Sequence, residues 1–467
     1  MLQIVDIKEI SNKIALEILA HKERQRLPRG KRFQSLIHSI EILIRDSVSL
    51  KLSKARNVYA SINKGAGHYS QSRYNSRLSY RIHIKLAYNG MCSLGYLQEV
   101  KAGVSHGPVG LYLTKYKATM KLLRHFRDIE PAVLPTILGS TPLDQTVRVQ
   151  ISLPIVDALS GRPRKQKQFV EYEDTEDTYV MRSNLRRINK AIGRRWIDLE
   201  LSDAALADLQ RQISSTKRSE EGHETNLNLT RTSLYRVFND IEFRTGGRFY
   251  GGWWQTIPKS YRRYLIIDGK RTVEADYSNL HPAILYAQRQ LEPPEDAYSG
   301  LLPQLPRAVA KQAFNAMLNA KAPMMKQPRG MKLSQFDIRW EDVVSAFMER
   351  HAPISDAFFT GSGGVLQRID SDLAERVMLR FLDYGRPVPV LPVHDSFILH
   401  HGYQHELKAF MELEFYEMFG QDINVELEYG GPASNHDASV STNLDDLLEA
   451  LPGYEKRLIA HQTLKEF

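Results

Sequence analysis

Residues 388–399 read VPVLPVHDSFIL and residues 272–278 read TVEADYS, and these two stretches decide the fold. The first is two apolar strands that meet at His394-Asp395, which predicts a hairpin with a carboxylate at its tip. The second alternates like a strand whose end presents Asp276. Taken singly, either aspartate is more typical of a cap or a turn. Together on one sheet, Asp276 and Asp395 are the paired carboxylates that two Mg²⁺ ions require.

A third stretch, residues 307–319 (RAVAKQAFNAMLN), lies between these two and predicts a helix. Arg307 and Lys311 are spaced i and i+4, and Asn315 follows at i+8 on the same face. Such a row could hold a triphosphate and help pyrophosphate to depart. In isolation the same pattern is more typical of a solvated basic face on a surface helix.

Composition places these motifs in a soluble globular chain of about two to four domains. The 467 residues are 42% hydrophobic and 25% charged, and no apolar run approaches the roughly 20 residues that a bilayer span needs. The first ten residues, MLQIVDIKEI, carry acid where a signal peptide would carry base. We therefore expect a cytoplasmic protein with no membrane partner. The single cysteine, Cys92, excludes an internal disulfide and a cysteine-based zinc site.

Positive charge is concentrated in residues 51–127, which hold 14 Lys/Arg and one acid, Glu99. The net charge of the whole chain is +9, so the remainder is slightly acidic. A basic segment with interleaved tyrosines favours a nucleic-acid partner, and the alternative is a solvated basic surface over a tyrosine-rich core. Within it, residues 80–117 read as a helix at 80–88, a turn at Asn89-Gly90, a second helix at 93–102 and a wing at 109–117, an order that resembles a winged helix.

The chain divides into three parts on these patterns. Residues 1–127 form a basic, mainly helical nucleic-acid-binding region with the winged-helix pattern at 80–117. Residues 128–228 form a mixed α/β connector that ends in the polar stretch 211–228, which has the composition of a linker. Residues 229–467 hold the motifs described above.

Five segments in this last part, in order over about 170 residues, resemble family A DNA polymerases and, more distantly, single-subunit phage-type RNA polymerases. Asp276-Tyr277-Ser278 is similar to motif A, residues 307–319 to motif B and Val393-His394-Asp395 to motif C. The segment TGGR at 245–248, with QTIP at 255–258, resembles the family's TGR and NIP stretches before motif A. Gln367 with Asp372-Leu373-Ala374 resembles the helix before motif C.

The resemblance implies an α+β fold, a right-hand polymerase palm on an antiparallel sheet with short helical fingers and a reduced thumb. It implies that Asp276 and Asp395 bind two Mg²⁺, for which Mn²⁺ can substitute, and that the Tyr277 carbonyl completes the metal shell. It places Arg307, Lys311 and Asn315 at the nucleotide phosphates. Arg248, Gln367 and His394 would face the primer terminus, and His281 would lie where related enzymes exclude a ribose 2′-hydroxyl.

Several departures leave alternatives open. Ser396 follows Asp395 where family A DNA polymerases have glutamate, and Asn319-Ala320 replaces the Tyr-Gly that closes motif B. Residues 279–284 (NLHPAI), together with Lys311 and Asn315, also echo family B signatures. The fingers segment between the two aspartates is short, and the first half shows no set of acids for a proofreading exonuclease.

We therefore expect a divergent, template-dependent DNA polymerase that acts on DNA template and primer with dNTPs, and whose ability to prime is open. One alternative is a primase or single-subunit RNA polymerase that uses NTPs. The other is a DNA-binding replication protein whose palm is inactive. The absence of proofreading associates the chain with a bacterial phage or mobile element, and a small helper protein is an open partner.

Overall fold

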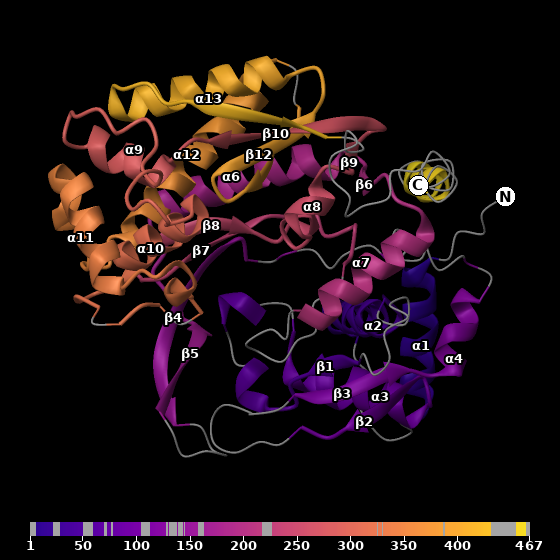
Figure 1. The fold of residues 1–467 in the computed structure, drawn as a ribbon. Helices are drawn as coiled ribbons and strands as arrows, with labels where there is room; N and C mark the ends of the chain where they lie inside the picture. Colours follow the sequence, from indigo (N-terminus) through magenta and orange to yellow (C-terminus); the bar gives the residue numbers. More distant parts are fainter. Residues whose placement is uncertain are drawn as a thin grey trace.

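The computed structural model describes most of the chain. The described residues are 6–21, 29–49, 59–69, 72–75, 78–103, 113–127, 129, 138, 143, 145–156, 163–216, 227–324, 326–328, 330–385, 388–430 and 454–463. Helices and mainly antiparallel sheets together form an α+β fold (Figure 1).

The N-terminal region begins with two amphipathic helices. They are α1 (Ile7–His21) and α2 (Lys31–Ser49), and they pack on each other through apolar residues such as Ile14 and Ile40. A three-stranded sheet of order β1-β3-β2 lies against them. Its strands and the short helices around it are β1 (Ala60–Ile62), β2 (Leu97–Lys101), β3 (Thr114–Ala118), η2 (Ala66–Tyr69), η3 (Arg73–Asn75), η4 (Arg81–Tyr88), α3 (Asn89–Ser93), α4 (Met120–Leu123) and η5 (Arg124–Phe126).

The expected helix-turn-helix is wrong. No turn separates η4 from α3, which continues it at Asn89, and the expected second helix is strand β2. Tyr96 and Leu97 are buried at the start of that strand, and β2 pairs with β3, so tertiary pairing overrides the local helical pattern. Of the expected wing, residues 109–112 lie outside the described residues, and Lys115 and Lys117 lie on β3.

Most described tyrosines of the basic segment are core or partly buried residues. Tyr88, Tyr96 and Tyr116 are buried in the N-terminal core, where Tyr88 and Tyr116 meet edge to face. Arg81, Lys85, Lys101 and Lys117 remain exposed. The described part of the segment thus has a tyrosine-rich core beneath a basic surface, and a nucleic-acid partner for that surface stays a prediction.

The central sheet has the order β11-β12-β10-β9-β6, and β13 also pairs with β10. Every strand pair in it is antiparallel. The strands are β6 (Ile197–Leu199), β9 (Leu265–Ile267), β10 (Lys270–Tyr277), β11 (Leu391–Val393), β12 (Ser396–His400) and β13 (Val425–Tyr429). Apolar residues Val273, Ala275 and Tyr277 alternate along β10, and Tyr277 packs on Phe415 of α13 (Gln404–Phe419). The opposite face of β10 therefore carries Glu274 and Asp276.

A second sheet has the order β5-β4-β7-β8, and its β4–β5 pair extends away from the first sheet as a long hairpin (Figure 1). Its strands are β4 (Val147–Val156), β5 (Pro163–Phe169), β7 (Tyr235–Phe238) and β8 (Gly246–Tyr250), of which β4 and β7 are parallel. One face packs on α12 (Gly363–Asp383), where the buried guanidinium of Arg236 contacts Ser371, Asp372 and Glu375.

The remaining helices complete the C-terminal part. They are α6 (Glu176–Gly193), α7 (Asp203–Thr216), η6 (Trp253–Gln255), α8 (Lys259–Arg262), α9 (Leu280–Ala287), α10 (Arg307–Asn319), η7 (Leu333–Phe336), α11 (Trp340–Arg350) and η8 (Ala352–Ala357). The stretch expected to be a linker is in part helical, since α7 runs to Thr216, and residues 217–226 lie outside the described residues.

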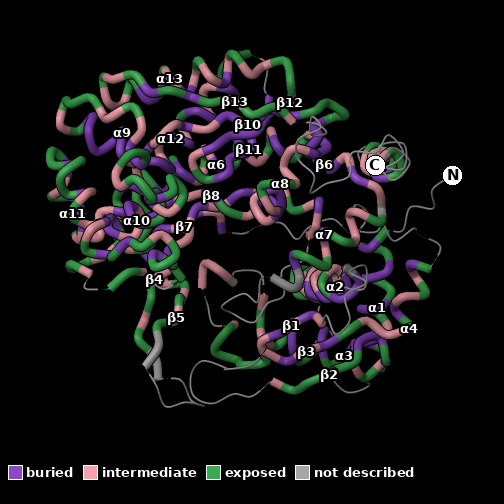
Figure 2. Tube along the Cα trace, in the orientation of Figure 1, coloured by how far each residue is buried: buried purple, intermediate pink, exposed green. Residues whose placement is uncertain are grey.

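Two hydrophobic cores organise these elements. One runs from Ile7 to Leu138 and includes Ala460 of a helix at 454–463, and the other runs from Val147 to Val425. The connector contributes to the second core, because β6 pairs with β9 and buries Ile197 and Leu199 there. Figure 2 shows buried residues concentrated in both parts.

No helix among the described residues is long and apolar enough to cross a membrane.

Candidate active site

The two aspartates singled out in the sequence lie at adjacent strand ends. Asp276 pairs in register with Ser396, so Asp395, in the two-residue turn before β12, lies beside it. His394 takes φ of +58°, which allows the tight reversal between β11 and β12. Two strands that are far apart in sequence thus present their carboxylates at one place.

The environment of Asp276 disfavours its charge. Burial and the neighbouring negative charge of Asp395 raise the pKa of Asp276 to about 7, while Lys311 acts in the opposite direction. Asp276 Oδ1 is buried and has no hydrogen-bond partner among the described residues. An unsatisfied oxygen between like charges fits a cation, because a bound cation would satisfy the oxygen and neutralise the pair.

The protein supplies few further ligands for such a cation. Among the described residues no group of three or more His, Cys, Asp or Glu is arranged to hold a metal ion. Mg²⁺ is often bound by one or two carboxylates together with waters and substrate phosphates. The pair fits that mode, with the Tyr277 carbonyl, at the end of β10, as the expected additional ligand.

Helix α10 presents its polar face near this pair. Ala310, Phe314 and Met317 are buried on one side, which leaves Arg307, Lys311 and Asn315 on the other. The charge of Lys311 acts on Asp276, so helix and sheet face each other.

Arg307 is held by acidic and amide oxygens. Its Nε lies 2.7 Å from Asp296 Oδ2 and its Nη2 lies 3.2 Å from Asn279 Oδ1. A cleft of about 840 Å³ opens here, beside the end of β10. It is lined by Ser278, Asn279, Asp296, Arg307, Arg350 and Glu426, among others. A phosphate that binds Arg307 must therefore compete with Asp296.

Arg248 and His281 meet on a carboxylate that the sequence motifs did not indicate. Arg248 Nη2 lies 2.5 Å and His281 Nε2 lies 3.1 Å from Asp370 Oδ2, and Asp370 is buried. Asp370 is one helical turn after Gln367 on α12, so both lie on the same side of the helix. In the sequence, the available signal for Asp370 was an acid one helical turn after Gln367.

His394 is the remaining expected contact to the primer. Burial and the charge of Arg248 lower the pKa of His394, although Asp395 opposes them. The ring is therefore biased toward its neutral form. Gln367 is half-buried near the start of α12, and its contact with the primer stays a prediction.

Glu274 is a third carboxylate that the sequence reasoning missed. It accepts a hydrogen bond from Ser396 Oγ at 2.6 Å and pairs with Arg262 Nη1 at 2.5 Å. Its position two residues before Asp276 puts both on one face of β10. In the sequence, this alternation was the signal for a second acid on the face of Asp276. Ser396, at the position where glutamate was expected, thus connects the hairpin to an acid on the neighbouring strand.

No family model matches this sequence, and no curated protein matches it. Among solved structures, the chain is similar to the POL domain of Pol1 from M. smegmatis in complex with DNA primer-template and dNTP, with 13% identity and a TM-score of 0.31. The match covers 49% of this chain and 51% of that chain, so the chain spans about half the length of the structure that it matches. A likeness at this level does not place the chain in a family.

Proposed function

We propose that this protein is a template-dependent nucleotidyltransferase, a divergent DNA polymerase of family A type that extends a primer with dNTPs. The observation that carries the proposal is the convergence of Asp276 and Asp395 at adjacent strand ends, with Asp276 Oδ1 buried and unpaired. The order of the five motif segments supports it.

Asp276 and Asp395 would hold two Mg²⁺ ions together with the Tyr277 carbonyl. When bound, such ions lower the pKa of an attacking hydroxyl and stabilise charge on the departing phosphates. Lys311 and Arg307 would bind and orient the triphosphate across from the aspartates, and Asn315 would extend that row. Catalysis then rests mainly on positioning and charge stabilisation.

Asp370 would organise the primer side. By fixing Arg248 and His281, it holds a cation and an imidazole close to the two aspartates. His281 would then border the sugar of the incoming nucleotide, with Gln367 and His394 next to the primer end.

A second candidate is RNA synthesis by a primase or a single-subunit RNA polymerase. His281 Nε2 can donate to Asp370 Oδ2, which leaves Nδ1 of a neutral ring as an acceptor. A ribose 2′-hydroxyl is a suitable donor for that nitrogen. Ser396, in place of glutamate, points in the same direction.

A primer-extension assay with dNTPs or NTPs, with and without a primer, tests the proposal. Extension of a primer by dNTPs supports the DNA polymerase. Products formed only from NTPs, or without a primer, favour the second candidate. Binding of template without any synthesis would leave a DNA-binding protein with an inactive palm.

A further inference from the structure

One face of the four-stranded sheet β5-β4-β7-β8 lies opposite α12, and the short helix η3 covers part of it, where Tyr74 stacks on Phe169. Arg236, Phe238 and Phe249 occupy the face that packs on α12. Because side chains alternate, Tyr235 of β7 and Tyr250 of β8 lie on the opposite face. Arg248, two residues before Tyr250 on the edge strand β8, reaches Asp370 of α12, so this face begins beside the candidate active site.

Aromatic rings and a guanidinium continue across the sheet from there. Tyr250 is paired with Tyr235, and their ring centroids are 6.2 Å apart. Arg148 Cζ lies 3.8 Å above the Tyr235 ring and 5.7 Å from the Phe169 ring, and Phe169 stacks on Tyr74 at 5.0 Å. Tyr250 and Phe169 are 38% and 42% exposed, so solvent reaches both rings.

Cations extend this row along the hairpin. Lys165, Lys167 and Phe169 alternate on β5, so they share one face, and both lysines are exposed. Within the part of the chain that the structure describes, no carboxylate forms an ion pair with Arg148, Lys165 or Lys167.

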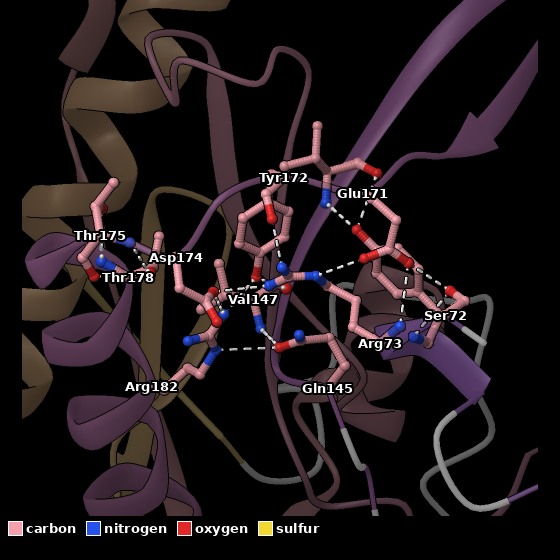
Figure 3. Close-up of polar contacts among 12 residues, drawn as sticks. Ser72, Arg73, Gln145, Val147, Glu171, Tyr172, Asp174, Thr175, Thr178 and Arg182 are labelled. Atoms are coloured by element: carbon pink, nitrogen blue, oxygen red, sulfur yellow. Dashed lines mark hydrogen bonds and ion pairs between the residues drawn. The ribbon is translucent and has the colours of Figure 1, made fainter.

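The nearest acids at the hairpin base are already neutralised. Glu171 and Asp174 bind Arg73, which stacks 3.6 Å from the Tyr172 ring, and Asp174 also binds Arg182 (Figure 3). This cluster joins the N-terminal region to the hairpin. Because these acids are paired with arginines, the open face keeps its positive charge. The same contacts hold the base of the hairpin in place.

We propose that this face, defined by Arg148, Lys165, Lys167, Phe169, Tyr235 and Tyr250, binds single-stranded nucleic acid and guides it to the candidate active site. Lysines and arginine suit phosphates, and exposed rings suit bases that are free of a partner strand. From β8 to β5 the row crosses about 14 Å, and from Phe169 to Lys165 it follows the strand for about 13 Å more. The direction of the path rests on the proposed function, whereas the binding does not.

Binding of a fluorescent oligothymidylate, measured by anisotropy against salt concentration, tests this face. A Lys165→Ala/Lys167→Ala variant should bind more weakly, and its slope of log K against log salt should fall by up to about 1.4, which is 0.7 for each single-strand phosphate that the variant no longer neutralises. Phe169→Leu keeps an apolar neighbour for Tyr74 but removes the ring. It should weaken binding by about 5- to 100-fold with little change in slope.

A matched control removes two exposed lysines from other elements, Lys8 of α1 and Lys270 of β10. It should bind like the wild type, and thermal unfolding should confirm that all variants fold. Unchanged affinity in both hairpin variants would overturn the proposal. An equal loss of affinity for duplex DNA would also overturn it, since the face would then be a general polyanion surface.

Asp276→Asn separates this inference from the proposed function. The variant should lose synthesis but bind the oligothymidylate as tightly as the wild type. If Asp276→Asn retains synthesis while the hairpin variants lose binding, the binding face stands and the assigned chemistry falls. If synthesis needs Asp276 but the hairpin variants bind normally, the assigned chemistry stands and the binding face is overturned.

Discussion

Asp276 combines burial, a like-charged neighbour and an unsatisfied oxygen, and this combination destabilises the protein without a bound cation. Its pKa is raised to about 7, so the folded state takes up a proton that the unfolded chain has already lost. Stability therefore falls as pH rises from about 4 to about 7. Functional residues are often held at such a cost.

Asp276→Asn should accordingly stabilise the metal-free protein, by on the order of 2 kcal/mol at pH 8 and by almost nothing at pH 4. Chemical denaturation at both pH values in EDTA measures this. Asp383→Asn, at an exposed site paired with Arg187, is the control and should show no such gain. A less stable Asp276→Asn variant at pH 8 would contradict the account of the site.

His281 should decide between sugars. If it excludes a 2′-hydroxyl by steric overlap, His281→Ala raises the use of NTPs relative to dNTPs by about 1–3 kcal/mol in kcat/KM discrimination. Asp370→Asn, which weakens the anchor of the ring, should act in the same direction to a smaller extent. Worse use of NTPs by His281→Ala would instead identify the imidazole as a ribose ligand.

At the scale of elements, β8 shows how backbone shape positions the site. Gly247 has φ of +86°, and a Cβ there would lie 2.7 Å from Phe238 Cε1 and 2.8 Å from Ser371 Oγ. Only glycine allows β8 to approach α12 so closely, and this approach brings Arg248 to Asp370.

Gly247→Ala should therefore destabilise the protein by about 2–4 kcal/mol and reduce synthesis, because backbone strain and steric overlap add. Denaturant unfolding measures the loss. Gly193→Ala is the control, since a Cβ at Gly193, at the end of α6, meets nothing within 4 Å. Equal effects of the two substitutions would refute the close-approach argument.

Local patterns predicted the elements that carry their own signal. The strand that ends in Asp276, the hairpin at His394-Asp395 and helix α10 all follow from periodicity and turn chemistry. Pairing between distant segments left no such signal. Local patterns do not show the parallel pairing of β4 with β7. They also do not show that residues 97–101 form β2. Both features depend on partner strands elsewhere in the chain.

The same distinction applies to the candidate site. The order of the motifs predicted Asp276, Asp395, Arg307 and Lys311 as site residues. The structure brings these four residues together. Asp370 lies inside the segment of α12 that resembles the helix before motif C but is not one of its matching residues, and its contacts come from β8 and α9. Its role as an anchor for Arg248 and His281 becomes visible only when these three elements pack together.

At the scale of the whole molecule, exposed cations of the described residues include those of the N-terminal region and those of the open sheet face. Replacing Arg81, Lys85, Lys101 and Lys117 by glutamine should lower the salt dependence of template binding by up to about 0.7–0.9 in slope for each phosphate that the variant no longer neutralises. Anisotropy titrations with primer-template DNA measure it. A control without Lys8, Lys13, Lys270 and Lys332 removes equal charge, and an equal effect there would mean that only net charge matters.

The most direct measurement is the rate of single-nucleotide addition by Asp276→Asn and Asp395→Asn on a primer-template with Mg²⁺, beside Asp383→Asn. The account predicts a loss of several orders of magnitude in both site variants, because charge stabilisation of the transition state is removed, with DNA affinity nearly unchanged and Asp383→Asn fully active. Synthesis retained by either site variant would contradict the claim that these two aspartates carry the chemistry.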